Sequence, residues 1–392
     1  MKVYLIAGEP SGDKLGGALM EGLKQLDPKV KFQGVGGPLM EAQGMTSLFA
    51  MDELSVMGLA EVLPKLRGLF RRRDETVEDI IGSGADVVVT IDSPDFCLRV
   101  LRKLRGLSGV PTVHYVAPSV WAWRPKRTER MKGIVDHVMA LLPFEPPYME
   151  RAGLACDFVG HPVVAEPLAE PSDASAFRNT YGLGGAPVVL ALPGSRRGEV
   201  TRLADIFGES LHKLAANWPD IRIVIPAAAP VAALVQQQTK SWPGQPVILD
   251  PRGMDADIAL AEKRAAFAAA DVALAASGTV SLELAANTVP MVIAYDMNWV
   301  SRKMIRAMLQ VDTVTLVNLV SETRTVPEFL GEACKPADIA RALEQALKPG
   351  PERSAQAAAA EITMERLGRG DEPPGLRAAK VVARVAGFGD LG

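Results

Sequence analysis

The first 165 residues alternate between short apolar runs and longer segments in which apolar positions recur every three or four residues. The short runs have the length of buried β-strands, and the longer segments have the period of helices that pack on a core. After the first strand and a glycine-rich loop, a helix is predicted at Lys14–Gln25. The strands of this half are predicted at Val3–Ala7, Lys31–Val35, Val87–Ile91, Thr112–Val116 and His137–Leu141. Such alternation is typical of a parallel sheet with helices on both faces.

The second half repeats the alternation after a stretch rich in Pro and Ala at 163–174, which indicates a linker. Helices are predicted here at Val200–Asn217 and Ala256–Ala270. The strands are predicted at Val188–Leu192, Arg222–Pro226, Val247–Leu249, Val272–Ala275 and Met291–Ala294. The fold class is therefore α/β, with two tandem doubly wound, Rossmann-like domains that face a cleft. We expect the domains at 1–165 and 166–350, followed by closing helices and a tail at 351–392.

Size and composition agree with this division, since 392 residues exceed what one core usually holds. The formal net charge of −3 argues against a general nucleic-acid-binding protein. The three cysteines are widely spaced, which fits neither a disulfide framework nor a zinc site. No apolar run reaches the roughly 20 residues of a membrane span, and the N-terminus has no signal-peptide pattern. We therefore expect a cytoplasmic protein that needs no metal or other cofactor.

The segment 271–290 has the pattern of a buried strand, a tight loop at Ser277-Gly278-Thr279 and a helix. Such a loop directs the unpaired N–H groups of the first helical turn toward a ligand, and Gly278 permits a close approach. With Thr279 as N-cap, Glu283 lies one residue past the capping-box position, so its carboxylate is free to accept hydrogen bonds from sugar hydroxyls. The alternative for Glu283 is an exposed residue favoured by the helix dipole. An anion is the expected ligand of this loop.

A second anion-binding candidate is the loop LPGSRRGEV at 192–200, which follows another predicted strand of the same domain. Ser195 can donate a hydrogen bond, and the planar guanidinium of Arg196 suits a diphosphate. An anion held by two loops, an arginine and a helix end requires no metal.

Two carboxylates are candidates for acid–base chemistry in the first domain. Glu9 lies in the loop GEPSGD, for which a simple tight turn is the alternative. Asp92 follows the predicted strand VVVTI and can act as general base for a hydroxyl. We assign Asp95 to capping the next helix, and His161, which is polar in an apolar setting, to a buried or hinge position.

The loop at 114–132, HYVAPSVWAWRPKRTERMK, combines Trp121 and Trp123 with a basic run that begins at Arg124. The tryptophans could stack on a base or lie against lipid headgroups, and the cations could bind phosphate. The alternative is a packed aromatic loop beside a solvated helix face.

Taken together, these loops resemble those of the lipid-A-disaccharide synthase family, inverting glycosyltransferases of the GT-B fold. The resemblance runs from Val3 to about Leu347. It rests on the ordered motifs AGEPSGD, GVGGPLM, VMGLAEVLP, IDSPDF, HYVAPSVWAWR, LPFE, VGHPVV, LPGSRRGEV and ASGTVSLE. The sequence departs from the family pattern at Pro10 and at Val317, the residue before Asn318.

The resemblance implies that UDP-2,3-diacylglucosamine and 2,3-diacylglucosamine 1-phosphate react to give the β-1,6-linked disaccharide of lipid A and UDP. It places UDP on the second domain, near Arg196, Ser277, Gly278, Thr279, Glu283 and Asn318, and catalysis near Glu9 and Asp92. The 6-hydroxyl of the acceptor would lose its proton to Asp92 and attack the anomeric carbon from the face opposite UDP, so that the configuration inverts.

Because both substrates carry acyl chains, the resemblance also implies an apolar surface with positive charge. The segment 56–73 offers one, since apolar residues recur there at helical spacing among basic residues. The alternative is that this stripe packs on the sheet, and Pro64 interrupts it. Contacts with the acceptor or the inner membrane are predicted for Val56, Met57, Leu63, Phe70, Arg71, Arg72, Trp121, Trp123 and Arg124. Peripheral association with the cytoplasmic face of that membrane, and a homodimer, complete the expectations.

Two other functions fit parts of this pattern. A UDP-N-acetylglucosamine 2-epimerase of the same fold would use the second domain identically but would have no use for a basic apolar segment. A non-catalytic nucleotide or lipid carrier would keep its function when Asp92 is replaced, whereas a transferase would lose turnover.

Overall fold

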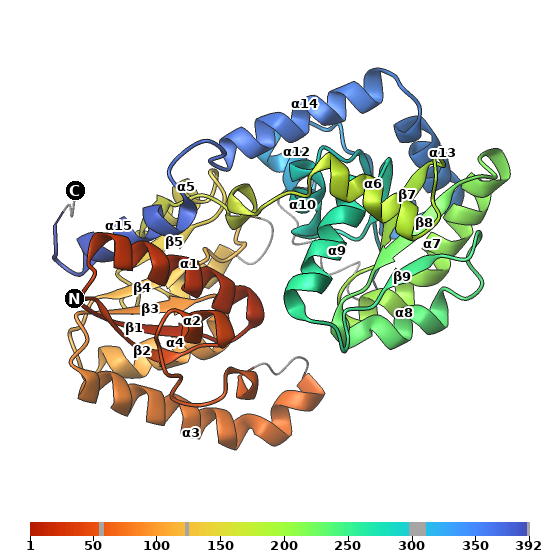
Figure 1. Ribbon diagram of the computed structural model, residues 1–392. Helices are drawn as coiled ribbons and strands as arrows, with labels where there is room; N and C mark the ends of the chain where they lie inside the picture. The colour runs from red at the N-terminus through yellow and green to blue at the C-terminus, as the bar shows by residue number, and fades with distance from the viewer. Residues whose placement is uncertain (55–58, 122–124, 298–310, 390–392) are drawn as a thin grey trace. The chain divides into compact units, whose positions relative to one another are not determined.

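The structure is a computed structural model that describes residues 1–54, 59–121, 125–297 and 311–389. The chain forms two compact units, each built on one six-stranded parallel sheet with helices on both faces (Figure 1). The first unit comprises Met1–Ala165 and Leu367–Gly392, and the second comprises Glu166–Arg366. The predicted α/β class with two doubly wound sheets is confirmed. The expected closing segment 351–392 is shared between the units, because its first helix belongs to the second unit and its last helix to the first.

The first unit has the strand order β2-β1-β3-β4-β5-β6. Its strands are β1 (Lys2–Ala7), β2 (Lys31–Val35), β3 (Val87–Ile91), β4 (Thr112–Tyr115), β5 (His137–Ala140) and β6 (Ala155–Phe158). Its helices are α1 (Pro10–Leu26), α2 (Pro38–Ala42), α3 (Leu59–Ser83), α4 (Pro94–Arg105), α5 (Pro146–Arg151) and α15 (Pro374–Val385).

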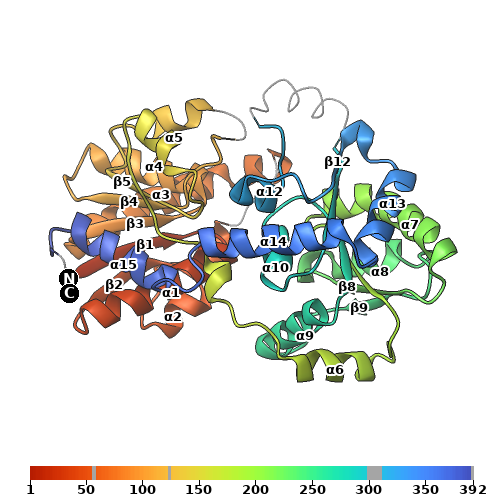
Figure 2. The ribbon, with the colours of Figure 1, turned by 90° about the horizontal axis from the view of Figure 1, so that it is seen from above.

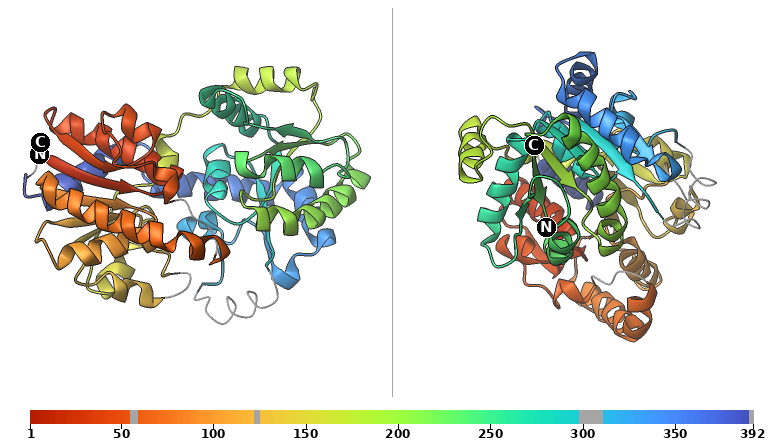
Figure 3. Two further views of the ribbon diagram at one scale, coloured as in Figure 1. Left: turned by 90° about the horizontal axis from the view of Figure 1, so that it is seen from below. Right: turned by 90° about the vertical axis from the view of Figure 1, so that its right-hand side faces the viewer.

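The side chains of β1 divide between two cores, as the two-residue period of a strand requires. Val3 and Leu5 pack in a cluster with residues of α1 and α15. Tyr4 and Ile6 point the other way, into a cluster with residues of α3 and α4. Figure 3 shows α1, in red, and α3, in orange, on opposite sides of this sheet. The central strands β1 and β3 are therefore buried on both faces of the sheet, which explains why they are almost wholly apolar.

The last helix, α15, lies directly against α1. A Cβ atom built on Gly22 of α1 would lie 2.6 Å from the carbonyl oxygen of Gly375, and one built on Gly375 would lie 2.4 Å from that of Ala18. The two backbones approach so closely that only glycine fits at either position. The C-terminal segment is thus an integral part of the first unit's core.

The second unit has the strand order β12-β11-β10-β7-β8-β9. Its strands are β7 (Val188–Leu192), β8 (Arg222–Pro226), β9 (Val247–Leu249), β10 (Val272–Ala275), β11 (Met291–Tyr295) and β12 (Glu328–Leu330). Its helices are α6 (Pro171–Thr180), α7 (Arg197–Asn217), α8 (Ala232–Gln238), α9 (Ala256–Ala268), α10 (Val280–Ala286), α12 (Leu316–Ser321), α13 (Pro336–Leu347) and α14 (Pro351–Arg366). The helix α14 packs alongside α10 and α12 (Figure 2).

The ten predicted strands are present, and the differences lie at sheet edges and helix starts. The edge strands β6 and β12 were not predicted, because their residues are largely half-buried and carry no continuous apolar signal. The helix α1 begins four residues before the predicted start, with Pro10 at its first position. Proline is tolerated there because the N–H group at this position has no acceptor within the helix.

Candidate functional site

A cavity of about 640 Å³ opens at the carboxyl edge of the second unit's sheet. It is lined by the loops that follow β7, β8, β9 and β10 and by one side of α9. The cavity brings together the predicted donor-site residues Ser195, Arg196, Ser277, Gly278, Thr279 and Glu283. Residues about 80 positions apart in the sequence meet here because β7 and β10 are adjacent parallel strands that end at the same edge.

The loop between β10 and α10 presents backbone N–H groups to this cavity. Thr279 is the N-cap of α10, as predicted. Among the described residues, the N–H groups of Gly278, Thr279 and Val280 have no acceptor. Gly278 has a φ of +156°, and a Cβ atom built there would meet no protein atom within 4 Å. The loop therefore offers donors and open space to an anion.

The loop between β7 and α7 is held from inside by Glu199, a residue that the sequence reasoning missed. Its Oε2 accepts hydrogen bonds from the backbone N–H of Ser195 at 3.1 Å and of Arg196 at 3.3 Å. A Cβ atom on Gly194 would lie 2.5 Å from the same oxygen, and Gly194 has a φ of +114°. The signal for this role was a Glu three residues after the helix N-cap, Arg196.

The Arg196 side chain extends into solvent, with 64% of its area exposed. Its Nη1 lies 3.5 Å from Glu199 Oε1, which is a loose ion pair. An exposed pair of this kind is worth little energy, so the guanidinium is available to an incoming anion.

The cavity lining also contains a tighter ion pair. Lys263 Nζ of α9 lies 2.5 Å from Glu283 Oε2. The prediction that the Glu283 carboxylate is free is therefore only half right, since Oε1 alone has no partner among the described residues. The adjacent Glu262 accepts a hydrogen bond from the Tyr181 hydroxyl.

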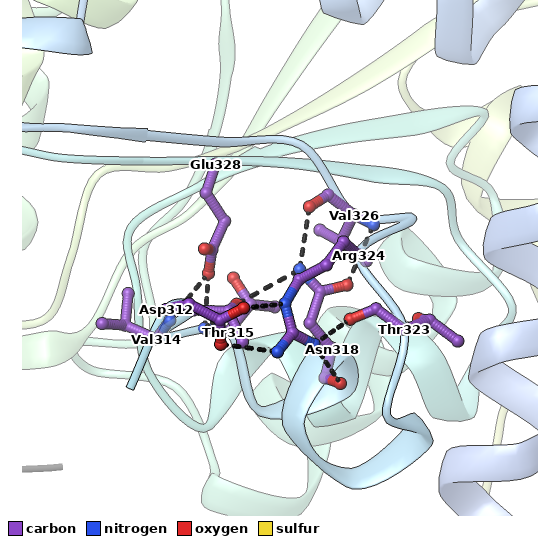
Figure 4. A network of polar contacts seen from close by, with 9 residues as sticks. Asp312, Val314, Thr315, Asn318, Thr323, Arg324, Val326 and Glu328 are labelled. Carbon is purple, nitrogen blue, oxygen red and sulfur yellow. Dashed lines mark hydrogen bonds and ion pairs between the residues drawn. The ribbon is translucent and has the colours of Figure 1, made fainter. Parts of the chain in front are cut away.

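Asn318 does not contribute its side chain to the cavity, and this prediction is wrong. The residue is 1% exposed, and its amide is saturated by protein groups (Figure 4). Nδ2 donates to the carbonyl oxygen of Val326 at 2.9 Å, and Oδ1 accepts from the N–H of Val326 at 3.0 Å. The amide thus replaces a β-ladder partner for Val326 and holds α12 against the segment that leads to β12.

In the first unit, Glu9 and Asp92 lie at the ends of neighbouring strands. β1 and β3 are paired with Ala7 opposite Ile91, so the two carboxylate-bearing loops leave the same edge. A Cβ atom on Gly8 would lie 2.6 Å from Ser93 Oγ, which shows how closely the loops pack. Burial raises the pKa of the Asp92 carboxyl above its ordinary value, although a backbone hydrogen bond from Ser93 opposes the shift. A carboxylate of raised basicity is suited to accept a proton.

The backbone beside Asp92 is strained. Asp92 and Ser93 have φ values of +50° and +42°, and Val116 at the end of the adjacent β4 has +85°. Left-handed conformations of this kind cost about 1–3 kcal/mol per residue and cluster at functional sites. At this turn, the end of β3 is followed directly by the Asp92 carboxylate and by the start of α4. Asp95, assigned to capping, lies instead exposed in the first turn of α4, whose N-cap is Ser93.

The carboxylate of Asp13 has a structural role in the same region. It is 3% exposed and accepts hydrogen bonds from the N–H groups of Gly37, Leu39 and Met40 at 2.8, 3.0 and 3.0 Å. The motif GEPSGD therefore caps α2, the helix of the motif GVGGPLM. His161 is buried, and its Nδ1 accepts a hydrogen bond from the N–H of Val163, which agrees with the structural role expected for it.

The structure contradicts a lipid or base contact for Trp121. This residue is 6% exposed, its ring makes an edge contact with Phe144, and its indole N–H donates to Glu145 Oε1 at 3.2 Å. Glu145 Oε2 also accepts from the N–H groups of Leu141 and Leu142. Burial raises the pKa of Glu145 to about 7. The motifs HYVAPSVWAWR and LPFE therefore meet in one packed polar cluster.

From Leu59 onward the basic apolar segment lies on α3, which runs through Pro64 without ending. Arg72 is wrongly predicted as a lipid contact, because its guanidinium binds Glu53 and Glu75 and stacks on Phe49. Phe70 is exposed, as is Arg71, which has no ion-pair partner among the described residues. Leu63 belongs to α3, but its side chain is outside the described part. The predicted contacts Val56, Met57, Trp123 and Arg124 lie outside the described residues.

Comparison with known proteins matches the chain to one sequence family. The family model described as lipid-A-disaccharide synthetase matches residues 3–371. The lipid-A-disaccharide synthase of Ruegeria pomeroyi is 61% identical over 382 residues, which cover 97% of this chain and 94% of the relative.

Two solved structures share the fold at low sequence identity. The UDP-GlcNAc 2-epimerase of Methanocaldococcus jannaschii, in complex with UDP-GlcNAc and UDP, is 13% identical with a TM-score of 0.61, covering 99% of this chain and 100% of that one. MurG of Acinetobacter baumannii is 14% identical with a TM-score of 0.56, covering 98% and 99%. The expected GT-B architecture is thereby confirmed.

Proposed function

Because the chain belongs to the lipid-A-disaccharide synthase family, we propose that its second unit binds the UDP group of the donor in the cavity described above and that Asp92 of its first unit is the general base. The chain is an inverting glycosyltransferase. It joins UDP-2,3-diacylglucosamine to 2,3-diacylglucosamine 1-phosphate and releases UDP. Membership of the family favours this reaction over the epimerase and the carrier, since the epimerase likeness extends to the fold alone.

The observation that carries the donor site is the gathering of six predicted residues around one cavity. The diphosphate would accept hydrogen bonds from the N–H groups of Gly278 and Thr279 and bind the exposed guanidinium of Arg196. The leaving group gains negative charge as the glycosidic bond breaks, and these fixed donors stabilise that charge. Pro226 and Leu249 line an apolar part of the cavity that suits the flat uracil ring.

The general base must take the proton of the acceptor's 6-hydroxyl as that oxygen attacks the anomeric carbon. Asp92 is proposed for this role because it combines partial burial, a raised pKa and a strained turn that directs it from the strand end. Glu9, on the neighbouring loop, is proposed to accept a hydrogen bond from the acceptor and to orient it.

The test is a UDP-release assay with both acylated sugars. Release should require both substrates, and Asp92→Asn should lower kcat by about 10²–10⁴-fold while the Kd for UDP stays unchanged. The exposed Asp95→Asn serves as the matched control and should keep full turnover. Turnover at the normal rate by Asp92→Asn would assign the base to another group, and UDP release without acceptor would contradict the transferase reaction.

Peripheral membrane contact is proposed through Phe70 and Arg71, two consecutive exposed residues of α3 that offer an apolar ring and a cation with no ion-pair partner in the described part of the chain. No helix in the described part of the chain combines the length and apolarity needed to cross a bilayer. The double variant Phe70→Ser, Arg71→Ser should co-sediment less with anionic liposomes at low salt, whereas the exposed Arg341→Ser should not differ from wild type. Equal binding of all three proteins would remove this surface from consideration. The homodimer and the location at the cytoplasmic face of the inner membrane stay predictions. Light scattering would test the oligomeric state.

A further inference from the structure

The donor cavity contains a second cation, Lys263, which no motif singled out. It lines the cavity from α9, while Arg196 lines it from the loop after β7. The two cations are held differently. Arg196 is loosely paired at 3.5 Å and 64% exposed, whereas Lys263 lies 2.5 Å from Glu283 and is 38% exposed. A cation held so tightly by a carboxylate is less available to a phosphate than a loosely held one.

The position of the Lys263 ammonium is fixed from two sides. Glu283 Oε2 lies on one side, and the ring of Phe267, one turn further along α9, lies 5.3 Å from Nζ on another. Phe267 is 2% exposed, so its ring is packed among other side chains. The neighbouring acid Glu262 accepts from Tyr181 and does not compete for the ammonium.

The consequence falls on Glu283, whose two oxygens become unequal. Oε2 is occupied by Lys263, and Oε1 has no partner among the described residues although Glu283 lines the cavity. A carboxylate oxygen accepts hydrogen bonds but donates none, so Oε1 can only receive a donor from a ligand. On a nucleotide, the donors that suit a carboxylate are the two vicinal hydroxyls of the ribose. A free glutamate would lose rotamer entropy on binding them, and the ion pair removes part of that cost in advance.

We propose that Lys263 is a positioning residue that orients Glu283 to accept hydrogen bonds from the ribose hydroxyls of the nucleotide. The role rests on the proposed binding of UDP in this cavity. In this role Lys263 does not contact the diphosphate, so it affects the affinity for UDP only through the hydrogen bonds between Glu283 and the ribose. The enzyme's preference for a ribonucleotide therefore depends on a residue that does not touch the ligand.

The experiment compares UDP with 2′,3′-dideoxy-UDP by titration calorimetry. Wild type should bind UDP about tenfold more tightly than the dideoxy analogue, as expected for a hydrogen bond to a charged group. Lys263→Met should remove most of this difference by weakening UDP alone, and Lys263→Arg should restore it, because a guanidinium can also pair with Glu283. Lys213→Met is the matched control, since Lys213 forms an ion pair on α7 away from the cavity lining.

The possible results separate the two proposals. If Lys263→Met weakens both ligands equally, the lysine acts on the diphosphate and the positioning role is wrong. If the variant discriminates as wild type does, Lys263 is a surface ion pair only. If wild type binds neither ligand, the assignment of UDP to this cavity fails, and the role of Lys263 fails with it. Circular dichroism of each variant confirms that the chain is folded before these comparisons are made.

Discussion

The loop that carries Arg196 should depend on Glu199, whose carboxylate accepts hydrogen bonds from the loop backbone. The carboxylate is 17% exposed and accepts two backbone hydrogen bonds, at 3.1 and 3.3 Å. Glu199→Gln keeps the shape but replaces a charged acceptor by a neutral one. Charge-assisted hydrogen bonds are about twice as strong as neutral ones, so weakening both bonds should reduce the free energy that holds the loop in place by about 1–2 kcal/mol. If this loss appears in binding, the Kd for UDP rises about 5- to 30-fold.

The assay is titration calorimetry with UDP and with uridine, which lacks phosphates. The loss should appear with UDP and be absent with uridine, because the loop acts on the diphosphate. Glu209→Gln is the control, since Glu209 lies on the same helix, is 63% exposed and forms an ion pair with Lys213. Gly194→Ala should give the same result as Glu199→Gln, because its Cβ atom would displace the carboxylate. Unchanged UDP affinity in both variants, or an equal loss with uridine, would refute the reasoning.

Two further predictions concern buried groups. Because burial raises the pKa of Glu145 from 4.5 to about 7, the folded state binds more protons than the unfolded state between these values. Its contribution to the free energy of unfolding should therefore fall by about 3 kcal/mol as the pH rises from 4.5 to 7 and above. Urea titrations from pH 5 to 8 should show Glu145→Gln becoming more stable relative to wild type as the pH rises. A stability difference that stays constant with pH would contradict this. Asn318→Ala should lower the free energy of unfolding in urea by about 2–4 kcal/mol, since it leaves the N–H and C=O groups of Val326 unpaired. The folded variant should keep its UDP affinity. A loss of UDP binding without a loss of stability would show that Asn318 contacts the ligand.

The wrong predictions share one physical cause. Asn318, Trp121 and Arg72 are polar or aromatic residues near real motifs, and such residues are equally suited to bind a ligand or to satisfy the protein. Their partners decide between the two roles. Asn318 pairs with Val326, Trp121 with Glu145 and Arg72 with Glu53. These partners lie between 8 and 24 residues away in the sequence, and local patterns do not reveal which side chains will meet.

The sequence alone determined the two parallel sheets and the loops that line the proposed donor site. Buried strands of both sheets are continuous apolar runs, and a functional loop after such a run is predictable because parallel strands end at one edge. The tertiary structure alone decided which side chains remain available to substrates. It paired Lys263 with Glu283, placed Glu199 beneath Arg196 and buried Asn318, because hydrogen bonds and ion pairs form between side chains that only the folded chain brings together.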